Sequence, residues 1–217
     1  MTKKTTMKLV FLSVAVLGLA LSASAQSSDA SPPAPTPAPA SGTGLLGQTY
    51  AGLTYTYTDI PNTSLNNQGL RFQYNEPVST GLDALFTYEG DRSARFDSTR
   101  NTFEQVGAAA VAYLPEFARA KPFVLFGAGW IWTHAWGVAN NSFAGQIGTG
   151  VEFRLSSPFV LTPYVTYTDA KVFAGRHRWN YGVKANYWLS DHWGVTATVD
   201  RDNHQDTGYG AGVNFRF

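Results

Sequence analysis

Cysteine is absent from the 217 residues of this chain, and only 14% of the residues are charged. Without cysteine there is no disulfide framework, thiol nucleophile, zinc–thiolate site or lipid-modified cysteine. A disordered chain would be highly charged and poor in aromatic residues, so the 14% aromatic content excludes that class. The net charge of +1 supplies no large field, and we expect no nucleic-acid partner.

Long hydrophobic runs are scarce as well, because the one apolar run lies at the extreme N-terminus. Residues 9–21 form 13 apolar or small residues that follow three early lysines and precede the small residues ASA at 23–25. A membrane-spanning helix needs about 20 residues. A basic start, a short apolar run and a small-x-small site instead indicate a cleavable signal peptide over residues 1–25. An uncleaved anchor helix is the alternative.

The next segment, residues 26–47, is rich in proline, alanine and serine. Its first part, residues 26–43, holds five prolines that alternate with small residues. Such a composition buries no core, and proline favours an extended polyproline II spacer. We predict a linker that precedes a domain at residues 48–217.

From residue 48 onward the dominant signal is a period of two. The last segment shows it best, since glycine and polar residues alternate with Tyr209, Ala211, Val213, Phe215 and Phe217. Alternate residues of a strand face opposite sides, so one face is apolar and the other is polar or glycine. The division recurs along the chain and predicts ten strands. Two are less clean, because residues 102–114 are alanine-rich and 159–168 contain Pro163.

The expected connections alternate in length. The longer, polar ones lie near residues 59–67, 90–100, 134–143, 169–177 and 201–206. The short ones lie near 75–79, 156–158 and 189–192, and the one near 115–121 is somewhat longer. Long loops at one end and tight turns at the other are typical of an up-and-down barrel with two unlike sides. The predicted fold is therefore all-β, a closed antiparallel up-and-down barrel of ten strands, with eight as the alternative.

The bulkier face of these strands is aromatic and aliphatic, and the smaller face carries glycine and charge. A soluble barrel would turn its apolar face inward, whereas this division favours apolar outside and polar inside. Tilted strands of about 9–11 residues cross a bilayer with all backbone groups paired. Aromatic residues at strand ends fit an interfacial girdle: Tyr55, Tyr57, Tyr88, Trp130, Trp132 and Trp179. We predict a transmembrane β-barrel.

Three segments carry a family resemblance: the ending YGAGVNFRF, the segment KPFVLFGAGWIW and the following GQIGTGVEFRLS. Over residues 48–217 the chain resembles small outer-membrane β-barrels of Gram-negative bacteria, of the opacity-protein and outer-membrane-protein-A-like type. The resemblance implies a monomer in the bacterial outer membrane, without a cofactor, surrounded by lipid and lipopolysaccharide. It also implies that periplasmic chaperones and the barrel-assembly machinery recognise the terminal residues Tyr209 to Phe217 as an insertion signal. Many members have eight strands, so ten would be a departure.

Catalysis has little support in the residues. Omptin proteases use an Asp–His pair at the extracellular mouth, but Asp191 and the adjacent His192 fall on a predicted turn at the other end. Lipid A deacylases use His-x-Ser-Asn, and His177 has no serine two residues on. Three histidines, with two aspartates near the last, are expected at the outer rim: His134, His177, His204, Asp202 and Asp206. Their spacing does not suggest metal ligands, and we expect neither an enzyme nor a metal site.

The polar face offers candidate interior residues. Eight charged residues are expected to project inward as a lumen charge network: Arg71, Asp83, Glu89, Glu152, Arg154, Lys184, Asp200 and Arg216. Opposite charges in a narrow interior tend to pair and fill it. A turn near Pro77 would place Arg71 opposite Asp83. We favour a closed lumen over a solute pore.

The fourth long loop offers candidate surface residues. Arg176 and Arg178 are expected to bind lipopolysaccharide phosphates while Trp179 fixes the barrel's height, with a solvated loop as the alternative. The predicted function is structural and surface-interacting, with polar loops exposed outside the cell. The alternative is a narrow porin-like channel for ions or small solutes.

Overall fold

The computed structural model describes residues 44–61, 66–93, 101–135 and 137–217, and nearly all of them lie in β-strands. The elements are β1 (Tyr50–Asp59), β2 (Asn66–Ser79), β3 (Leu82–Ser93), β4 (Thr102–Tyr113), β5 (Ala120–Ala135), β6 (Val138–Arg154), β7 (Phe159–Ala170), the short 3-10 helix η1 (Ala174–Arg176), β8 (His177–Trp188), β9 (Trp193–Asp202) and β10 (Thr207–Arg216). Within these residues no helix is long and apolar enough to cross a membrane.

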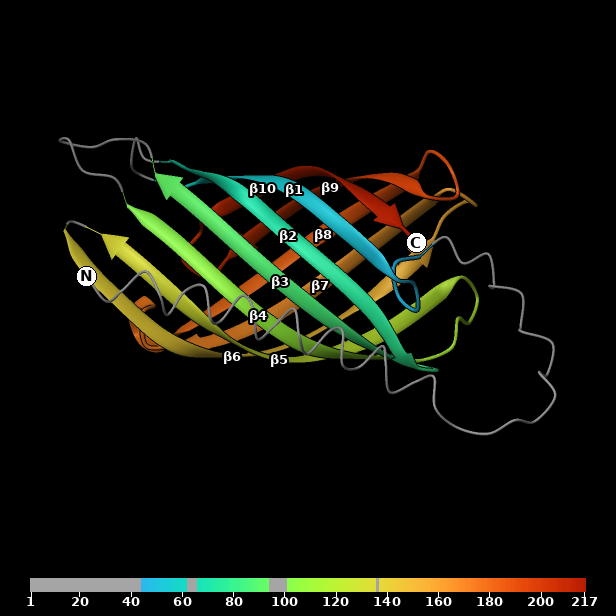
Figure 1. The fold of residues 1–217 in the computed structure, drawn as a ribbon, viewed down its shortest axis with the longest axis horizontal. Helices are drawn as coiled ribbons and strands as arrows, with labels where there is room; N and C mark the ends of the chain where they lie inside the picture. The colour runs from blue at the N-terminus through green and yellow to red at the C-terminus, as the bar shows by residue number, and fades with distance from the viewer. Residues whose placement is uncertain (1–43, 62–65, 94–100, 136) are drawn as a thin grey trace. The chain divides into compact units, whose positions relative to one another are not determined.

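The ten strands close into an antiparallel up-and-down barrel (Figure 1). Each strand pairs with its sequence neighbours, and β1 pairs with β10 from Tyr50↔Arg216 to Asp59↔Thr207. The ring therefore has no edge along its main body. The predicted fold class is confirmed with ten strands, and the eight-stranded alternative is wrong.

The alternation of the sequence sets the two faces of the barrel wall. On β10 the side chains of Tyr209 and Val213 are exposed on the outside, whereas Asn214 is buried inside. The alanine-rich β4 and the proline-containing β7 follow the same rule as full strands. Pro163 lacks an N–H group, and the β6–β7 pairing is interrupted beside it while its pairing with Val183 of β8 is kept. The prediction of apolar outside and polar inside is confirmed.

The barrel has two unlike ends. The connections β2–β3, β4–β5, β6–β7 and β8–β9 lie at one end together with the C-terminus, and we call this the turn end. The other five connections form the loop end. Asp191 and His192 lie on the β8–β9 turn, as the strand order predicted.

One expected long loop is wrong. Residues 134–143 do not form a loop, because β5 runs to Ala135 and β6 begins at Val138. Gly137, with φ of 79°, provides the left-handed conformation that a two-residue hairpin connection needs. Residues 138–143 pair with β5 alone, since the β6–β7 pairing starts only at Ala144↔Ala170. The β5–β6 hairpin thus projects beyond its neighbours at the loop end, on the left in Figure 1.

Candidate functional site

The barrel encloses a lumen cavity of about 370 Å³. Its lining extends from Leu45 and Glu152 at the turn end to Arg178 and Asp206 at the loop end. The charged lining residues come from β2, β3, β6, β8, β9 and the β9–β10 loop. The β4 and β5 wall contributes Gln105 and four apolar residues: Phe103, Val111, Phe123 and Leu125. The lumen is therefore charged on one side and largely apolar on the other.

The central contact of the lumen joins Arg71 on β2 to Glu89 on β3. Arg71 Nε lies 3.1 Å from Glu89 Oε2, and Nη2 lies 2.8 Å from Oε1, so the pair is bidentate. The expected pairing of Arg71 with Asp83 is wrong, because the chain turns at residues 80–81 rather than near Pro77. That shift places Asp83 opposite Pro77 and Arg71 opposite Glu89.

Other lumen groups form a polar network around this pair. Asp91 Oδ1 accepts a hydrogen bond from Thr56 Oγ1 at 2.8 Å, and Lys184 Nζ lies 3.3 Å from Gln73 Oε1. Asp200 lies 3.4 Å from the Tyr164 hydroxyl. Sequence reasoning missed Asp91, because it ended the strand at residue 89. The alternation could have revealed Asp91, because it lies two residues after Glu89 and so faces the same side of β3, which continues to Ser93.

At the turn end, residues 44–48 fold into the lumen ahead of β1, and we call them the plug segment. The N–H groups of Leu45 and Leu46 donate to Glu152 Oε1 at 3.0 and 3.3 Å. The N–H of Gly47 donates to Asp83 Oδ2 at 2.8 Å. Asp83 and Glu152 are 0% and 6% exposed. Both expected lumen carboxylates are thus inside, where they bind backbone N–H groups of the chain itself.

The plug segment has further polar contacts. Asn75 Nδ2 donates to the carbonyl of Gln48 at 2.9 Å and to Asp83 Oδ2 at 2.8 Å. Lys121 Nζ donates to the carbonyl of Leu46 at 3.0 Å. Residues 44–47, which the sequence analysis assigned to the linker, therefore contact the interior of the barrel.

Two of the eight expected lumen charges lie at the turn-end rim, outside the cavity. The Arg154 guanidinium forms an ion pair with Glu116 on the β4–β5 connection. Arg216 Nε donates to the carbonyl of Asp191 at 2.8 Å, and its guanidinium lies 4.5 Å from the centre of the Trp188 ring. In the alternation of their strands, both residues belong to the inward face. They are the last residues of β6 and β10, however, so groups at the rim bind them.

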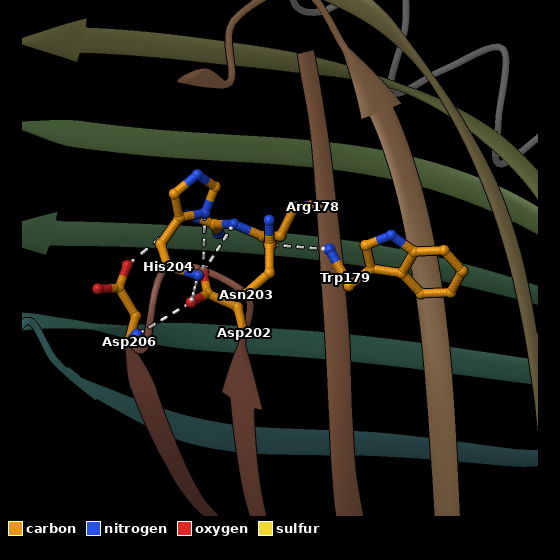
Figure 2. A network of polar contacts seen from close by, with 6 residues as sticks. All are labelled: Arg178, Trp179, Asp202, Asn203, His204 and Asp206. Carbon is orange, nitrogen blue, oxygen red and sulfur yellow. Dashed lines mark hydrogen bonds and ion pairs between the residues drawn. The ribbon is translucent and has the colours of Figure 1, made fainter. Parts of the chain in front are cut away.

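Figure 2 shows the polar cluster at the loop end, and Arg178 of this cluster lines the lumen cavity. Arg178 Nε lies 3.1 Å from Asp202 Oδ2 and Nη2 lies 3.9 Å from Asp206 Oδ2. The Arg178 guanidinium also lies over the Phe173 ring, 4.8 Å from its centre. The Arg178 guanidinium is thus paired with Asp202, and its expected contact with lipopolysaccharide stays a prediction. Arg178 faces inward because side chains alternate along β8 and its neighbour Trp179 faces outward.

Asp202 organises the β9–β10 connection. Its Oδ1 accepts hydrogen bonds from the N–H groups of His204 at 2.8 Å and Asp206 at 2.9 Å, while Oδ2 faces Arg178. Burial and the neighbouring Asp202 carboxylate raise the pKa of Asp206, and the Arg178 guanidinium opposes that shift. The cluster therefore fixes one loop by a carboxylate that satisfies two backbone groups and a cation.

Arg176 and Trp179 do lie on the outside of the loop end. Arg176 is exposed with a φ of 67°. The Trp179 ring lies 4.9 Å from that of Tyr167, and the Trp179 N–H donates to Asn203 Oδ1 at 2.9 Å (Figure 2). A lipopolysaccharide contact by these two residues stays a prediction.

The expected insertion signal occupies the outer face of β10 and the residue after it. The Phe215 ring lies 5.1 Å from that of Phe217 and 4.9 Å from that of Trp193. The Phe217 N–H donates to the carbonyl of Thr49 at 3.1 Å. The terminal aromatic residues therefore sit at the seam where β10 meets β1, and their role in assembly stays a prediction.

The histidines do not assemble a site. His134 lies in β5 rather than in a loop, His177 stacks on Tyr167, and His204 Nδ1 lies 3.8 Å from Asp202 Oδ2. Across residues 44–61, 66–93, 101–135 and 137–217, no group of three or more His, Asp or Glu side chains is arranged so that it could hold a metal ion.

Comparison with known proteins shows a shared fold. No family model and no curated protein sequence matches this chain. The chain is similar in structure to the translocator domain of the autotransporter NalP from Neisseria meningitidis, with 13% identity and a TM-score of 0.50, covering 78% of this chain and 88% of that domain. It is also similar to the NanC porin, with 11% identity and a TM-score of 0.51, covering 77% and 100%. At these identities the likeness shows the fold alone.

Proposed function

We propose that this protein is an integral β-barrel of the bacterial outer membrane with a structural and surface-interaction role. Its outer wall carries large exposed apolar side chains on seven of the ten strands, such as Tyr55, Phe72, Phe126, Ile147, Tyr181, Val199 and Val213. A continuous apolar surface of this extent marks a membrane or protein contact. A closed ring also satisfies every backbone group of its main body, which a lipid environment demands.

Aromatic residues at both ends of the wall support the same environment. Trp130, Trp132 and Trp179 lie toward the loop end, and Trp193 and Phe217 toward the turn end. Amphipathic rings favour the two interfaces that flank the hydrocarbon.

The observation that favours a structural role over an open pore is the plug segment, which occupies part of the lumen at the turn end. The side chains there are buried, including Leu45, Tyr50, Val160, Trp188 and Asn214. Leu45 of the plug segment packs with Tyr50 and Trp188 in one buried cluster. NalP and NanC are an autotransporter and a porin by name, so the shared fold does not choose between roles.

The β5–β6 hairpin is the surface that we assign to interaction. Its outer edge at residues 138–143 lacks a strand partner on the β7 side, and Val138 and Phe143 are 57% and 60% exposed. Residues 122–151 contain no Asp, Glu, Lys or Arg. Natural edges are usually protected by charge or proline, and an unprotected edge accepts an added strand.

Cysteine labelling on intact cells tests the membrane topology, because the native chain has no cysteine. We expect Asn140→Cys at the loop end to react with a membrane-impermeant maleimide. Asp191→Cys at the turn end should react only after the outer membrane is permeabilised. Labelling of neither residue in a folded, membrane-fractionated protein, or the reverse pattern, would overturn the proposal.

A narrow channel is the second candidate, and the cavity that extends between the two ends favours it. Planar-bilayer recording of the purified wild-type protein separates the two roles. Stable unitary current steps would support the channel, and electrical silence after verified insertion would support the structural role.

A further inference from the structure

The turn end of the lumen is shaped as a binding recess for the plug segment. Two buried carboxylates, Glu152 and Asp83, accept three successive backbone N–H groups, and Asn75 and Lys121 donate to two of the segment's carbonyl groups. Charge-assisted hydrogen bonds to backbone are roughly twice as strong as neutral ones. These contacts recognise the backbone of an extended peptide.

The fit around the plug segment is close. Leu45 packs in a buried cluster with Tyr50 and Trp188. A Cβ atom added to Gly44 would lie 2.3 Å from Glu152 Oε2, and one on Gly47 would lie 2.9 Å from the Tyr113 hydroxyl. Gly47 also has a φ of 80°, a conformation that favours glycine. A side chain at Gly44 would displace the Glu152 carboxylate, and one at Gly47 would strain the backbone as well.

The plug segment is nevertheless separable from the wall. It lies outside the strand ladder, which starts at Tyr50, and side chains supply most of its polar contacts. Its departure would break no β-sheet hydrogen bond. It would also remove the backbone donors of Glu152 and leave Asp83 with Asn75 as its donor.

The cavity lining is anionic. It contains six carboxylates and three cationic side chains: Glu89, Asp91, Glu152, Asp200, Asp202 and Asp206 against Arg71, Arg178 and Lys184. The low-dielectric wall of the barrel focuses the electric field of these charges into the lumen. In channels, rings of Asp and Glu side chains select cations. A lumen opened at the turn end would therefore carry small cations in preference to anions.

We propose that the plug segment is a releasable ligand of its own barrel, and that its release opens the lumen to small monovalent cations. The inference rests on the proposed membrane insertion but adds an activity that the closed barrel lacks. The plugged state is the silent one, and the N-terminal linker is the part of the chain on which a release force would act.

The test is planar-bilayer recording of the full-length protein in a potassium chloride gradient. Glu152→Gln/Asp83→Asn keeps the side-chain shapes but removes the charges that hold the plug segment. We expect its open probability to exceed that of wild type by at least about tenfold, because even one charge-assisted hydrogen bond is worth that factor. The reversal potential should have the sign of potassium selectivity. Glu116→Gln, at the same end but outside the lumen, is the matched control and should behave as wild type.

A second variant keeps the proposal testable if the double variant does not fold. Gly47→Val strains the left-handed backbone and pushes against Tyr113 while leaving both carboxylates in place, so it should open the lumen as well. Heat-shifted gel mobility checks that each variant is folded. Folded and inserted variants that remain silent, or that conduct no more than wild type, overturn the plug. Anion selectivity overturns the cation assignment. Failure of folded wild type to enter the bilayer instead counts against the proposed membrane function.

Discussion

Arg71 and Glu89 lie directly opposite each other on β2 and β3, and their side chains meet in two parallel contacts inside the lumen. The side chains are 27% and 18% exposed, so each would be left poorly solvated without the other. Removing one partner of a buried pair lowers the free energy of unfolding by more than the intact pair contributes to it, because the remaining charge is uncompensated.

We therefore expect Glu89→Ala to destabilise the barrel more in the wild-type background than in the Arg71→Ala background. The coupling free energy should be about 1–2 kcal/mol for a pair that is partly solvated. Urea unfolding of the four proteins of the cycle in lipid vesicles measures it. The cycle of Arg71→Ala with Asp83→Ala is the control and should be additive. Additive losses for Arg71 and Glu89 would contradict the pair.

The β9–β10 connection should depend on Asp202 more than on Asp206. Asp202→Ala removes the acceptor of two backbone N–H groups and the partner of Arg178, and should destabilise the connection by about 1–3 kcal/mol. Asp202→Asn keeps an acceptor oxygen and should cost less. Asp206→Asn should cost least, since its contact to Arg178 is 3.9 Å long. Hydrogen exchange at the amides of residues 203–206 gives the order, and equal exchange in all three variants would refute it.

Phe217→Asp should lower the amount of protein in the outer membrane with little effect on the stability of barrels that do assemble. Phe217 lies at the end of the wall, where a charged side chain costs at most about 1 kcal/mol, less than at the midplane of the bilayer. Membrane fractionation and urea unfolding separate the two effects, and Phe217→Tyr is the control. Normal membrane levels of the aspartate variant would contradict an insertion signal.

Substitutions of Arg176 and Arg178 should have different effects on lipopolysaccharide binding. Arg176→Ala should reduce the lipopolysaccharide that copurifies with the barrel, because its guanidinium is free to reach phosphate at the surface. Arg178→Ala should instead release the β9–β10 connection. Arg119→Ala is a matched control, since Arg119 is also exposed and has a φ of 71° but lies at the turn end. Equal lipopolysaccharide in the Arg176 and Arg119 variants would leave only a solvated loop.

The sequence was sufficient for the strands and their faces. The alternation from Tyr209 to Phe217 depends only on the pleat of a strand, so β10 and its outward residues could be read directly. The same alternation correctly placed the side chains of Glu89, Lys184 and Asp200 inside the barrel.

Features that depend on where a strand ends were harder to predict. The turn at 80–81 rather than at Pro77 changed the partner of Arg71, and Gly137 replaced a loop by a hairpin. The plug segment was missed because residues 44–48 carry no periodicity. Its place is set by side chains from β2, β3, β5 and β6, which no local pattern reports.

The plug segment also bears on the order of assembly. Its partners Asn75, Asp83, Lys121 and Glu152 lie on four different strands, and the Thr49 carbonyl beside it binds the last residue, Phe217. Those groups surround one point in the closed ring, where β10 has paired with β1. The segment can therefore dock in full only when these four strands hold their native register. A barrel in which one of them has slipped would leave residues 44–48 undocked, and proteases could cleave it there.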